Sequence, residues 1–340
     1  MTVALTGYGL YRPADRITGE EVAERSGLPE DVVVEKMGIR EKRVCPPDDD
    51  HVTDMCVTAA RRALADAAVD PAELDLVLYH GSEYKDYVVW SAAANVAERI
   101  GAETAYATEN HTLCASTPVA IRQTAAQIRT GDIQTALHVT ASRETDLLDY
   151  TDEDASFMFN FGSGGAAYVL EADRDGQQSR ARIRQSVAIT DGSFAEDVIM
   201  PAGGSKDPPS AETVAAGEHA LTVVDPEEMK ERMALVSGQN FRAVAEEALA
   251  MSGYDRADVG FVAVTHMKRS FHRSLLADLG VDPESDGYYL DEYGHVQSAD
   301  QWLALDEGRK RDRVQSGDVV LFLAAGTGYT WSGTVLEWLG

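Results

Sequence analysis

The fold and the chemistry of this chain centre on one stretch, Asn110-His111-Thr112-Leu113-Cys114-Ala115-Ser116-Thr117-Pro118. A cysteine stands there between the end of an extended run and a helix of small residues, which the apolar spacing predicts from Ala115 to Thr130 with Gly131 as its stop. A thiol at a helix N-terminus feels the positive end of the peptide dipoles, which favours the nucleophilic thiolate. Cys114 is therefore a candidate nucleophile, and a buried structural cysteine is the alternative.

The composition limits the class of protein. The 340 residues carry a formal net charge of −27, from 57 acidic and 30 basic residues, which argues against nucleic acid or an anionic membrane as a partner. Three cysteines are too few for a disulfide framework and indicate a reducing compartment. Because the first residues lack a signal-like segment and no apolar run approaches the ~20 residues of a membrane span, we expect a cytoplasmic protein.

The basic residues include only seven lysines. An acid-rich, lysine-poor composition suits high salt, where a Debye length of roughly 3 Å screens self-repulsion. We therefore hypothesise adaptation to high salt. The hypothesis is wrong if activity and Tm both peak at low salt and fall in molar potassium chloride.

The sequence pattern of the first half recurs in the second. Residues 70–77 resemble residues 255–262 at an offset of 185, and small residues of the preceding helix recur at the same offset. The Gly-Asp-Ile at 131–133 meets the Gly-Asp-Val at 317–319 at an offset of 186. These matches predict two duplicated α/β halves. The polar junction near 172–182 divides them into residues 1–172 and 183–340.

Local patterns place the elements that bear on the site. Val3–Tyr11 has the pattern of a strand, and Leu74–His80 and Val259–His266 are apolar runs typical of strands in a sheet covered on both faces. Thr53 is expected to cap the helix that follows it, and Ser298 could cap a later helix.

Reactive residues fall at the predicted ends of strands. In such α/β folds, sites form where strands end and helices begin, between the halves. Cys114 takes this position in the first half. In the second half, His266 ends an apolar strand, His295 precedes a helix, and residues 325–331 form a glycine-rich loop. We expect these four features to form one site.

Six stretches along nearly the whole chain carry a family resemblance: Met37–Arg43, Ser91–Ala93, Leu113–Ala115, Phe161–Ala167, Pro201–Ser205 and Gly326–Trp331. On these stretches the chain resembles the thiolase superfamily, specifically its β-ketoacyl-ACP synthase III branch of condensing enzymes. The resemblance implies a five-layered αβαβα fold of two duplicated halves, usually a homodimer. It also implies an acyltransferase of fatty acid or polyketide biosynthesis that uses coenzyme A or acyl carrier protein thioesters and no tightly bound cofactor.

The resemblance also implies roles for individual residues. Cys114 would be the acylated nucleophile, and the backbone N–H groups of Cys114 and Thr327 would form the oxyanion hole. His266 matches the histidine that opens the family's His-Gln-Ala-Asn motif, of which residues 267–269 keep nothing. His295 stands where the family usually has asparagine, and its imidazole can likewise donate an N–H to a thioester carbonyl.

A carboxylate raises a second possibility. Glu83 is similar in position to the general base of hydroxymethylglutaryl-CoA synthases, where a glutamate deprotonates acetyl-cysteine. The alternative is a solvated loop residue with an ordinary ion pair. An ionised Glu83 in the pocket would repel a malonyl carboxylate by several kcal/mol at an effective dielectric of ~20 and a separation of ~4 Å. Glu83 in the pocket and a malonyl donor are therefore in tension.

Basic residues cluster locally on this acidic chain: Lys36, Arg40, Lys42, Arg43, Lys268, Arg269 and Arg273. Of these, Lys36, Arg40, Lys268 and Arg269 are candidates to bind phosphopantetheine or an acidic carrier protein, and surface solvation is the alternative. Val32 occupies the position of a family tryptophan that often stacks on the adenine of coenzyme A, which favours a carrier-bound donor or a rearranged site. The histidines and cysteines show no paired ligand spacing, so no metal site is expected. Cys45 and Cys56 are expected to be inert.

We therefore expect decarboxylative Claisen condensation through acyl-Cys114, with the donor carbonyl held by His266 and His295. Three alternatives stay open. They are hydroxymethylglutaryl-type condensation with Glu83 as base, acyl transfer to an oxygen or nitrogen acceptor, and a non-catalytic partner subunit.

Overall fold

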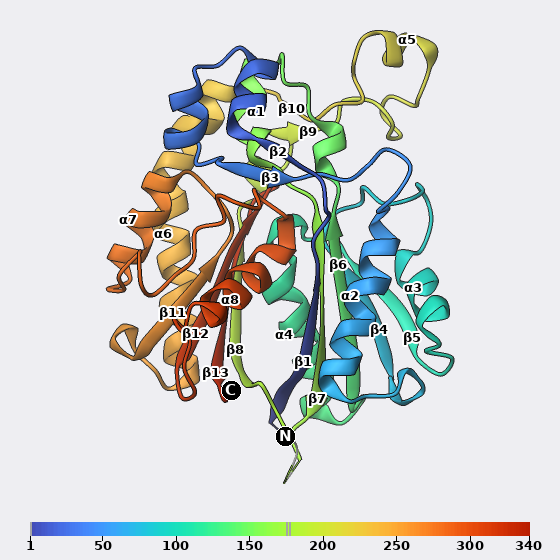
Figure 1. Cartoon of the computed structure of the whole chain (residues 1–340), viewed down its shortest axis with the longest axis vertical. Coiled ribbons are helices and arrows are strands. Elements are labelled where there is room, and N and C mark those ends of the chain that lie inside the picture. The colour runs from blue at the N-terminus through green and yellow to red at the C-terminus, as the bar shows by residue number, and fades with distance from the viewer. Residues whose placement is uncertain (1, 175, 177) are drawn as a thin grey trace.

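A long mixed sheet runs through the computed structural model, which describes residues 2–174, 176 and 178–340 (Figure 1). Within these residues nine strands form one sheet in the order β11-β12-β13-β8-β1-β7-β6-β4-β5. The strands are β1 (Val3–Tyr11), β4 (Leu76–His80), β5 (Tyr106–Asn110), β6 (Thr135–Ser142), β7 (Gly164–Ala172), β8 (Ala181–Thr190), β11 (Val259–Val264), β12 (Val319–Gly326) and β13 (Thr330–Trp338). Two small sheets pair β2 (Arg16–Thr18) with β3 (Glu41–Arg43) and β9 (Val198–Ile199) with β10 (Thr222–Val223).

The helices pack around and between the two parts of this sheet (Figure 1). The α-helices are α1 (Gly19–Ser26), α2 (Val52–Ala67), α3 (Ala92–Ile100), α4 (Ser116–Thr130), α5 (Ala211–Ala215), α6 (Pro226–Ser252), α7 (Arg269–Asp278) and α8 (Asp300–Lys310). The shorter turns are η1 (Val32–Lys36), η2 (Pro71–Glu73), η3 (Leu113–Ala115), η4 (Glu144–Leu147), η5 (Glu153–Asn160), η6 (Gly192–Phe194), η7 (Arg256–Asp258) and η8 (Gln297–Ala299). Among the described residues, no helix is both long and apolar enough to cross a membrane.

The sheet consists of two similar halves joined at its centre. β4 pairs in parallel with β5 and β6, and β6 continues through antiparallel β7 to β1. In the second half β11 pairs in parallel with β12, which continues through antiparallel β13 to β8. Gly287 pairs with Val262 of β11 in an isolated parallel bridge, at the position that corresponds to β5 beside β4 in the first half. The antiparallel β1–β8 pair joins the halves, so the predicted duplication is confirmed.

The predicted junction lies between β7, which ends at Ala172, and β8, which begins at Ala181. Positions 175 and 177 of that junction lie outside the described residues. The division into 1–172 and 183–340 stays a prediction.

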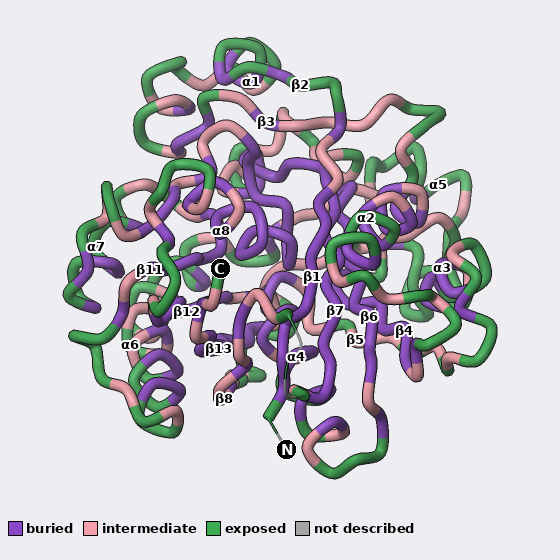
Figure 2. Tube along the Cα trace, turned by 60° about the horizontal axis from the view of Figure 1, so that its bottom comes forward, coloured by how far each residue is buried: buried purple, intermediate pink, exposed green. Residues whose placement is uncertain are grey.

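The helices that follow Cys114 and His295 in the chain, α4 and α8, share the central core. Ile121 and Ile128 of α4 and Trp302 and Leu305 of α8 belong to one buried cluster with strand residues of both halves. Figure 2 shows this buried interior as the purple traces of the central strands and of the segments between them. Close approach depends on small residues, because a Cβ at Gly9 of β1 would lie 2.4 Å from the Ala59 carbonyl oxygen of α2.

Two predicted helix caps are wrong. α2 begins at Val52 with His51 as its N-cap, and Thr53 lies inside the first turn, where its backbone N–H donates to Asp86 at 3.1 Å. α8 is preceded by Ala299, and the Ser298 hydroxyl instead bonds Thr140 at 3.0 Å. Both hydroxyl groups instead bond side chains that are distant in sequence, Asp86 for Thr53 and Thr140 for Ser298. The helix after Cys114 is confirmed, since α4 spans Ser116–Thr130 and Gly131 ends it with φ 80°.

Candidate active site

Cys114 lies in a tight turn between β5 and α4. Leu113 before it adopts φ 51°, a left-handed conformation that costs a non-glycine residue about 1 kcal/mol or more, and its N–H donates to the Gly81 carbonyl at 3.1 Å. The end of β12 comes close from the second half, because a Cβ at Gly326 would lie 3.0 Å from the Cys114 nitrogen. The turn therefore fixes a buried thiol beside the glycine-rich loop, with the first turn of α4 following it.

The second half repeats this turn without a nucleophile. Gln297 has φ 49° and precedes Ser298, as Leu113 precedes Cys114. Each turn leads into one of the two central helices, and the Thr117 hydroxyl of α4 donates to the Ser298 carbonyl at 2.6 Å. The duplication therefore brings the two turns together at one place between the halves.

His295 contacts Cys114 directly. Its Nε2 lies 3.0 Å from Sγ of Cys114, and its Nδ1 lies 2.6 Å from Oδ2 of Asp300. All three side chains are buried. A nucleophile within hydrogen-bond reach of a base that a third group orients is the arrangement used in covalent catalysis.

Asp300 is a site residue that the sequence reasoning missed. Its carboxylate also accepts the backbone N–H groups of His266 and Val296, both at 2.7 Å. One buried carboxylate at the start of α8 thus fixes the two histidine segments relative to each other. The available signal was an acidic residue five positions after His295, at the start of the helix predicted there.

The charge of Asp300 controls the protonation of His295. Burial by itself lowers the pKa of this imidazole, but the Asp300 carboxylate and the Cys114 sulfur outweigh burial and hold its pKa well above the usual 6.5. The imidazolium form of His295, placed against the Cys114 sulfur, is therefore favoured at neutral pH. This pairing converts a weak nucleophile into a strong one.

His266 has the opposite environment. The Asn160 amide donates to Nδ1 of His266 at 2.9 Å, so the ring proton lies on Nε2. That Nε2 is buried and has no partner within the described part of the chain. Burial, reinforced by the positive charge of His295, lowers the pKa of His266 to about 3. His266 is thus a neutral ring with a free N–H donor, suited to an incoming carbonyl oxygen.

A buried lysine supports both histidines. Lys42 is 0% exposed, and its Nζ donates to the carbonyl groups of Phe159 and Phe161, each at 2.7 Å. The backbone carbonyl of Asn160, between them, accepts the backbone N–H of His295 at 2.7 Å, and the Phe161 ring lies edge-on to the His295 ring at 5.2 Å. Lys42 was predicted in a surface cluster, and that prediction is wrong because its sequence neighbours, not Lys42 itself, face solvent.

Comparisons with known proteins place this arrangement in a family. Residues 109–192 match the family described as 3-oxoacyl-[acyl-carrier-protein] synthase III, and residues 249–338 match its C-terminal counterpart. Beta-ketoacyl-[acyl-carrier-protein] synthase III of Desulfitobacterium hafniense is 28% identical over 338 residues, covering 99% of this chain and 98% of the relative. The chain belongs to the 3-oxoacyl-ACP synthase III family. Its superfamily is that of the thiolases, as the predicted five-layered fold implies.

Solved structures agree with this fold. The 3-oxoacyl-[acyl-carrier-protein] synthase III of Aquifex aeolicus has a TM-score of 0.84 at 22% identity, covering 99% of this chain and all of the other. The priming β-ketosynthase of a polyketide biosynthetic pathway has a TM-score of 0.81 at 25% identity and covers 99% of this chain and 96% of its own.

This family member does not bring Glu83 to the cysteine. Its side chain is 81% exposed, and its ion-pair partner is His111, 3.5 Å away. The role of Glu83 as a base stays a prediction that this geometry does not support. Ser82, next to Glu83, instead donates its hydroxyl hydrogen bond to a different and buried carboxylate, Glu144, which also accepts one from Ser142 and whose pKa is raised by burial.

The positions of Thr327 and of the two other cysteines can be compared with their predicted roles. Thr327 follows Gly326 and therefore lies close to the Cys114 backbone, as its predicted oxyanion role requires. Cys45 and Cys56 are free thiols whose pKa values burial raises, to about 12 for Cys45, which is consistent with inert cysteines.

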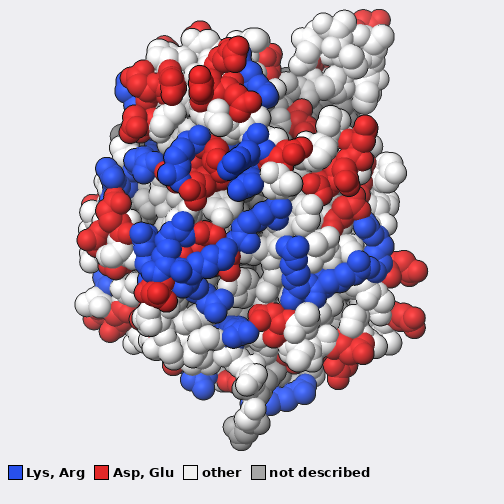
Figure 3. All heavy atoms as spheres, viewed as in Figure 1, with Lys and Arg blue, Asp and Glu red and all other residues white. Residues whose placement is uncertain are grey.

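Two of the four candidate basic residues pair with neighbouring acids, Asp291 and Glu292, in the segment before His295. The Arg40 guanidinium pairs with Glu292 and that of Arg269 pairs with Asp291 at 2.8 Å. Lys36 and Lys268 are exposed and flank the segments that carry those arginines. Figure 3 shows lysine and arginine side chains in a band across the face seen in Figure 1, below a strongly acidic region.

Proposed function

We propose that the chain is a condensing acyltransferase of the β-ketoacyl-ACP synthase III type that works through an acyl-Cys114 intermediate. The observation that carries the proposal is the 3.0 Å contact of Cys114 Sγ with His295 Nε2, backed by Asp300. The family membership supports the same reaction class.

In the first half-reaction, the Cys114 thiolate attacks the carbonyl carbon of an acyl thioester. The developing oxyanion is held by the N–H groups of Cys114 and Thr327, and its collapse expels the carrier thiolate. That thiolate takes a proton from the solvent and leaves as the free thiol, so His295 keeps its own proton. The acyl group stays on Cys114 in a buried site, where hydrolysis is limited because water is excluded.

In the second half-reaction, the carbonyl of a malonyl-type thioester accepts the free Nε2–H of His266. Loss of carbon dioxide leaves the electron pair of the broken C–C bond as an enolate, whose oxygen this hydrogen bond stabilises. The enolate carbon attacks the acyl carbonyl, forms the new C–C bond and expels the Cys114 thiolate. His295 in its imidazolium form supplies a second N–H donor once the thioester sulfur no longer competes for its proton.

The geometry also favours a second candidate, acyl transfer to an alcohol or amine. In its neutral form His295 keeps its proton on Nδ1 toward Asp300 and exposes a lone pair on Nε2, the state of a general base. Such a base would deprotonate an O–H or N–H acceptor beside acyl-Cys114. Because the pKa of His295 is raised, this form gains population only as pH rises through that pKa.

Product analysis separates the candidates. Enzyme acylated on Cys114 is mixed with carboxyl-labelled malonyl thioester, and condensation predicts labelled carbon dioxide and a β-keto thioester in equal amounts. Ester or amide formed from an added alcohol or amine, without carbon dioxide, would establish the second candidate instead. Condensation with acetoacetyl thioester that depended on Glu83 would favour the hydroxymethylglutaryl-type reaction.

A non-catalytic partner role is tested separately. If Cys114→Ala protein supported full activity of a larger complex, the chain would be a structural subunit. The buried and oriented Cys114–His295 pair argues against this role.

The charge and the exposed apolar residues of the surface indicate which molecules the chain binds. We propose that Lys36, Arg40, Lys268 and Arg269 engage coenzyme A or the phosphopantetheine of an acyl carrier protein, since the rest of the chain is strongly acidic. We also propose a homodimer. β5 lies at the edge of the sheet, and the connection between β4 and α3 carries three exposed apolar residues, Tyr87, Val88 and Val89. Light scattering after size-exclusion chromatography tests the dimer.

A further inference from the structure

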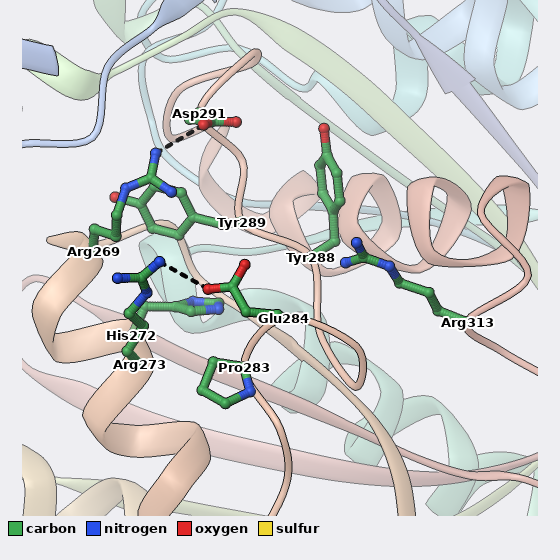
Figure 4. Close-up of a pocket in the computed structure, with 9 residues that line it drawn as sticks. All are labelled: Arg269, His272, Arg273, Pro283, Glu284, Tyr288, Tyr289, Asp291 and Arg313. Carbon is green, nitrogen blue, oxygen red and sulfur yellow. Dashed lines mark hydrogen bonds and ion pairs between the residues drawn. The ribbon is translucent and has the colours of Figure 1, made fainter. Parts of the chain in front are cut away.

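A cationic pocket borders Tyr289, whose ring also packs against the His266 ring at 4.8 Å, and Figure 4 shows the residues that line this pocket. It has a volume of ≈ 150 Å³, and α7 supplies Arg269, His272 and Arg273 to its wall. Arg313 closes the opposite side, beside Tyr288. A volume of this size suits a small ion with a few waters.

Its three guanidinium groups are only partly neutralised. Arg269 pairs with Asp291, and Arg273 pairs with Glu284, each at 2.8 Å. The Glu284 side chain is 73% exposed, so that pair is screened by solvent and easily exchanged. Arg313 donates to the Gly287 carbonyl at 2.7 Å and, within the described residues, forms no ion pair. The pocket therefore holds an excess of positive charge.

A buried imidazole in the wall lacks a partner. His272 is 2% exposed, and no group in the described residues bonds its Nε2. Gly287 packs closely beside that nitrogen, because a Cβ there would lie 3.9 Å from it and 2.6 Å from Cδ2 of Leu276. Burial lowers the pKa of His272 to about 4, so the ring is neutral at pH 7 and can donate one N–H. An unpaired buried donor near Arg313, which has no acid partner among the described residues, points to an acceptor ligand.

We propose that this pocket is a binding site for a phosphate-type oxyanion, held by Arg313, Arg273 and the Nε2–H of His272. The planar guanidinium fork matches the spacing of phosphate oxygens, and the ring N–H supplies a further donor at fixed geometry. An anion in the pocket takes the place of Glu284 at Arg273. The proposal does not rest on the reaction at Cys114, because binding is measured directly.

The pocket shares a wall with the active site. The Tyr289 ring lies 5.1 Å from the His272 ring and 4.8 Å from the His266 ring, and its hydroxyl donates to the Met267 carbonyl at 2.7 Å. The Arg269 guanidinium lies over the same ring at 4.4 Å. A bound anion that draws on these arginines therefore acts on a ring that packs against His266.

Titration with inorganic phosphate tests the site in the full-length protein. Calorimetry at low ionic strength is expected to give saturable binding of one phosphate per chain, weakened about tenfold or more in Arg313→Gln and in His272→Phe. Arg242→Gln on α6, where the arginine pairs with Asp278 at 2.9 Å, is the matched control and is expected to bind as the wild type does. Circular dichroism of each variant verifies the fold, and Arg313→Gln alone decides the outcome if His272→Phe does not fold.

A second readout locates the ion. In protein labelled with ¹⁵N at histidine, the ring signals of His272 are expected to shift along the phosphate titration, with a smaller shift at His266. Phosphopantetheine compared with pantetheine identifies the source of the anion. Binding of both free phosphate and phosphopantetheine places a carrier phosphate within reach, and binding of free phosphate alone assigns a separate ion site. Absence of saturable phosphate binding in the wild type, or binding unchanged in Arg313→Gln, would overturn the proposal.

Discussion

Two buried histidines in one site have opposite protonation chemistry. His295 lies between a carboxylate and a thiol, and its pKa is raised, whereas His266 lies beside a neutral amide, and its pKa falls to about 3. Both rings are buried, so burial alone does not separate them. The partner of Nδ1 decides: Asp300 for His295 and Asn160 for His266. One ring is thereby fitted to activate the thiol, and the other to hold a carbonyl oxygen as a neutral donor.

The largest effect is expected when the partner of His295 loses its charge. Asp300→Asn keeps the shape but removes the anion that stabilises the imidazolium, so Cys114 acylation is expected to slow by roughly 10³–10⁴-fold. The pH midpoint for Cys114 alkylation by iodoacetamide is expected to move upward at the same time. Asp278→Asn on α7, which removes an exposed carboxylate, serves as the control. An unchanged alkylation midpoint in Asp300→Asn would contradict the role of His295 as the group that activates Cys114.

The complementary change is made at His266. His266→Gln replaces the rigid N–H group that bonds the carbonyl of the malonyl thioester. Condensation with malonyl thioester is therefore expected to fall by roughly 10²–10³-fold. Acylation of Cys114 is expected to stay near the wild-type rate, because His266 does not contact the thiol. Rapid-quench measurement of each half-reaction separates the two effects, with His219→Gln as a surface control. Equal losses in both half-reactions would show that His266 and His295 do not have separate roles in condensation and acylation.

A smaller effect is expected at Lys42, a positioning residue beneath both histidines. Lys42→Met leaves the Phe159 and Phe161 carbonyls without their donor and loosens Asn160 and Phe161, which is expected to lower kcat about tenfold. The test is the pH profile of kcat together with the Cys114 alkylation midpoint. A variant with a lower Tm but an unchanged profile would assign Lys42 to stability alone, and Lys206→Met on the surface is the matched control.

The last expected effect is on stability against acid rather than on catalysis. The pKa values of His80 and His266 are about 3 and that of His272 is about 4, all below the unfolded value of 6.5, because burial opposes their charge. The unfolded state therefore binds more protons below pH 6.5, and stability is lost as pH falls from 6.5 toward 4, by up to about 1.4 kcal/mol per pH unit for each histidine. Calorimetric Tm values between pH 7 and 4.5 measure this loss, and His80→Gln is expected to reduce its slope. A Tm that rises over this range would contradict the assignment.

Much of the fold could be predicted from the sequence because its signals are local or repeated. The apolar spacing and Gly131 define the helix after Cys114, and the recurring patterns at an offset of 185 predict the duplicated halves. The two helix caps could not be predicted. Thr53 and Ser298 bond groups that are distant in sequence, and propensity does not see these partners.

The site was predictable in its reactive residues and not in their support. Cys114, His266 and His295 stand at strand or loop ends that the pattern marks. Asp300 resembles an ordinary first-turn acid of a helix, and only its three buried hydrogen bonds distinguish it. Lys42 and Glu83 sit in charged stretches of sequence, and tertiary packing buries one and exposes the other.

The measurement that tests the central claim most directly is mass spectrometry of the Cys114 peptide after incubation with acyl thioesters of several chain lengths. The account predicts that one acyl group appears on Cys114 and on neither Cys45 nor Cys56, that Cys114→Ala protein carries none, and that Asp300→Asn protein acquires it far more slowly. Turnover without any acyl group on Cys114, or equal labelling rates in wild-type and Asp300→Asn protein, would contradict it.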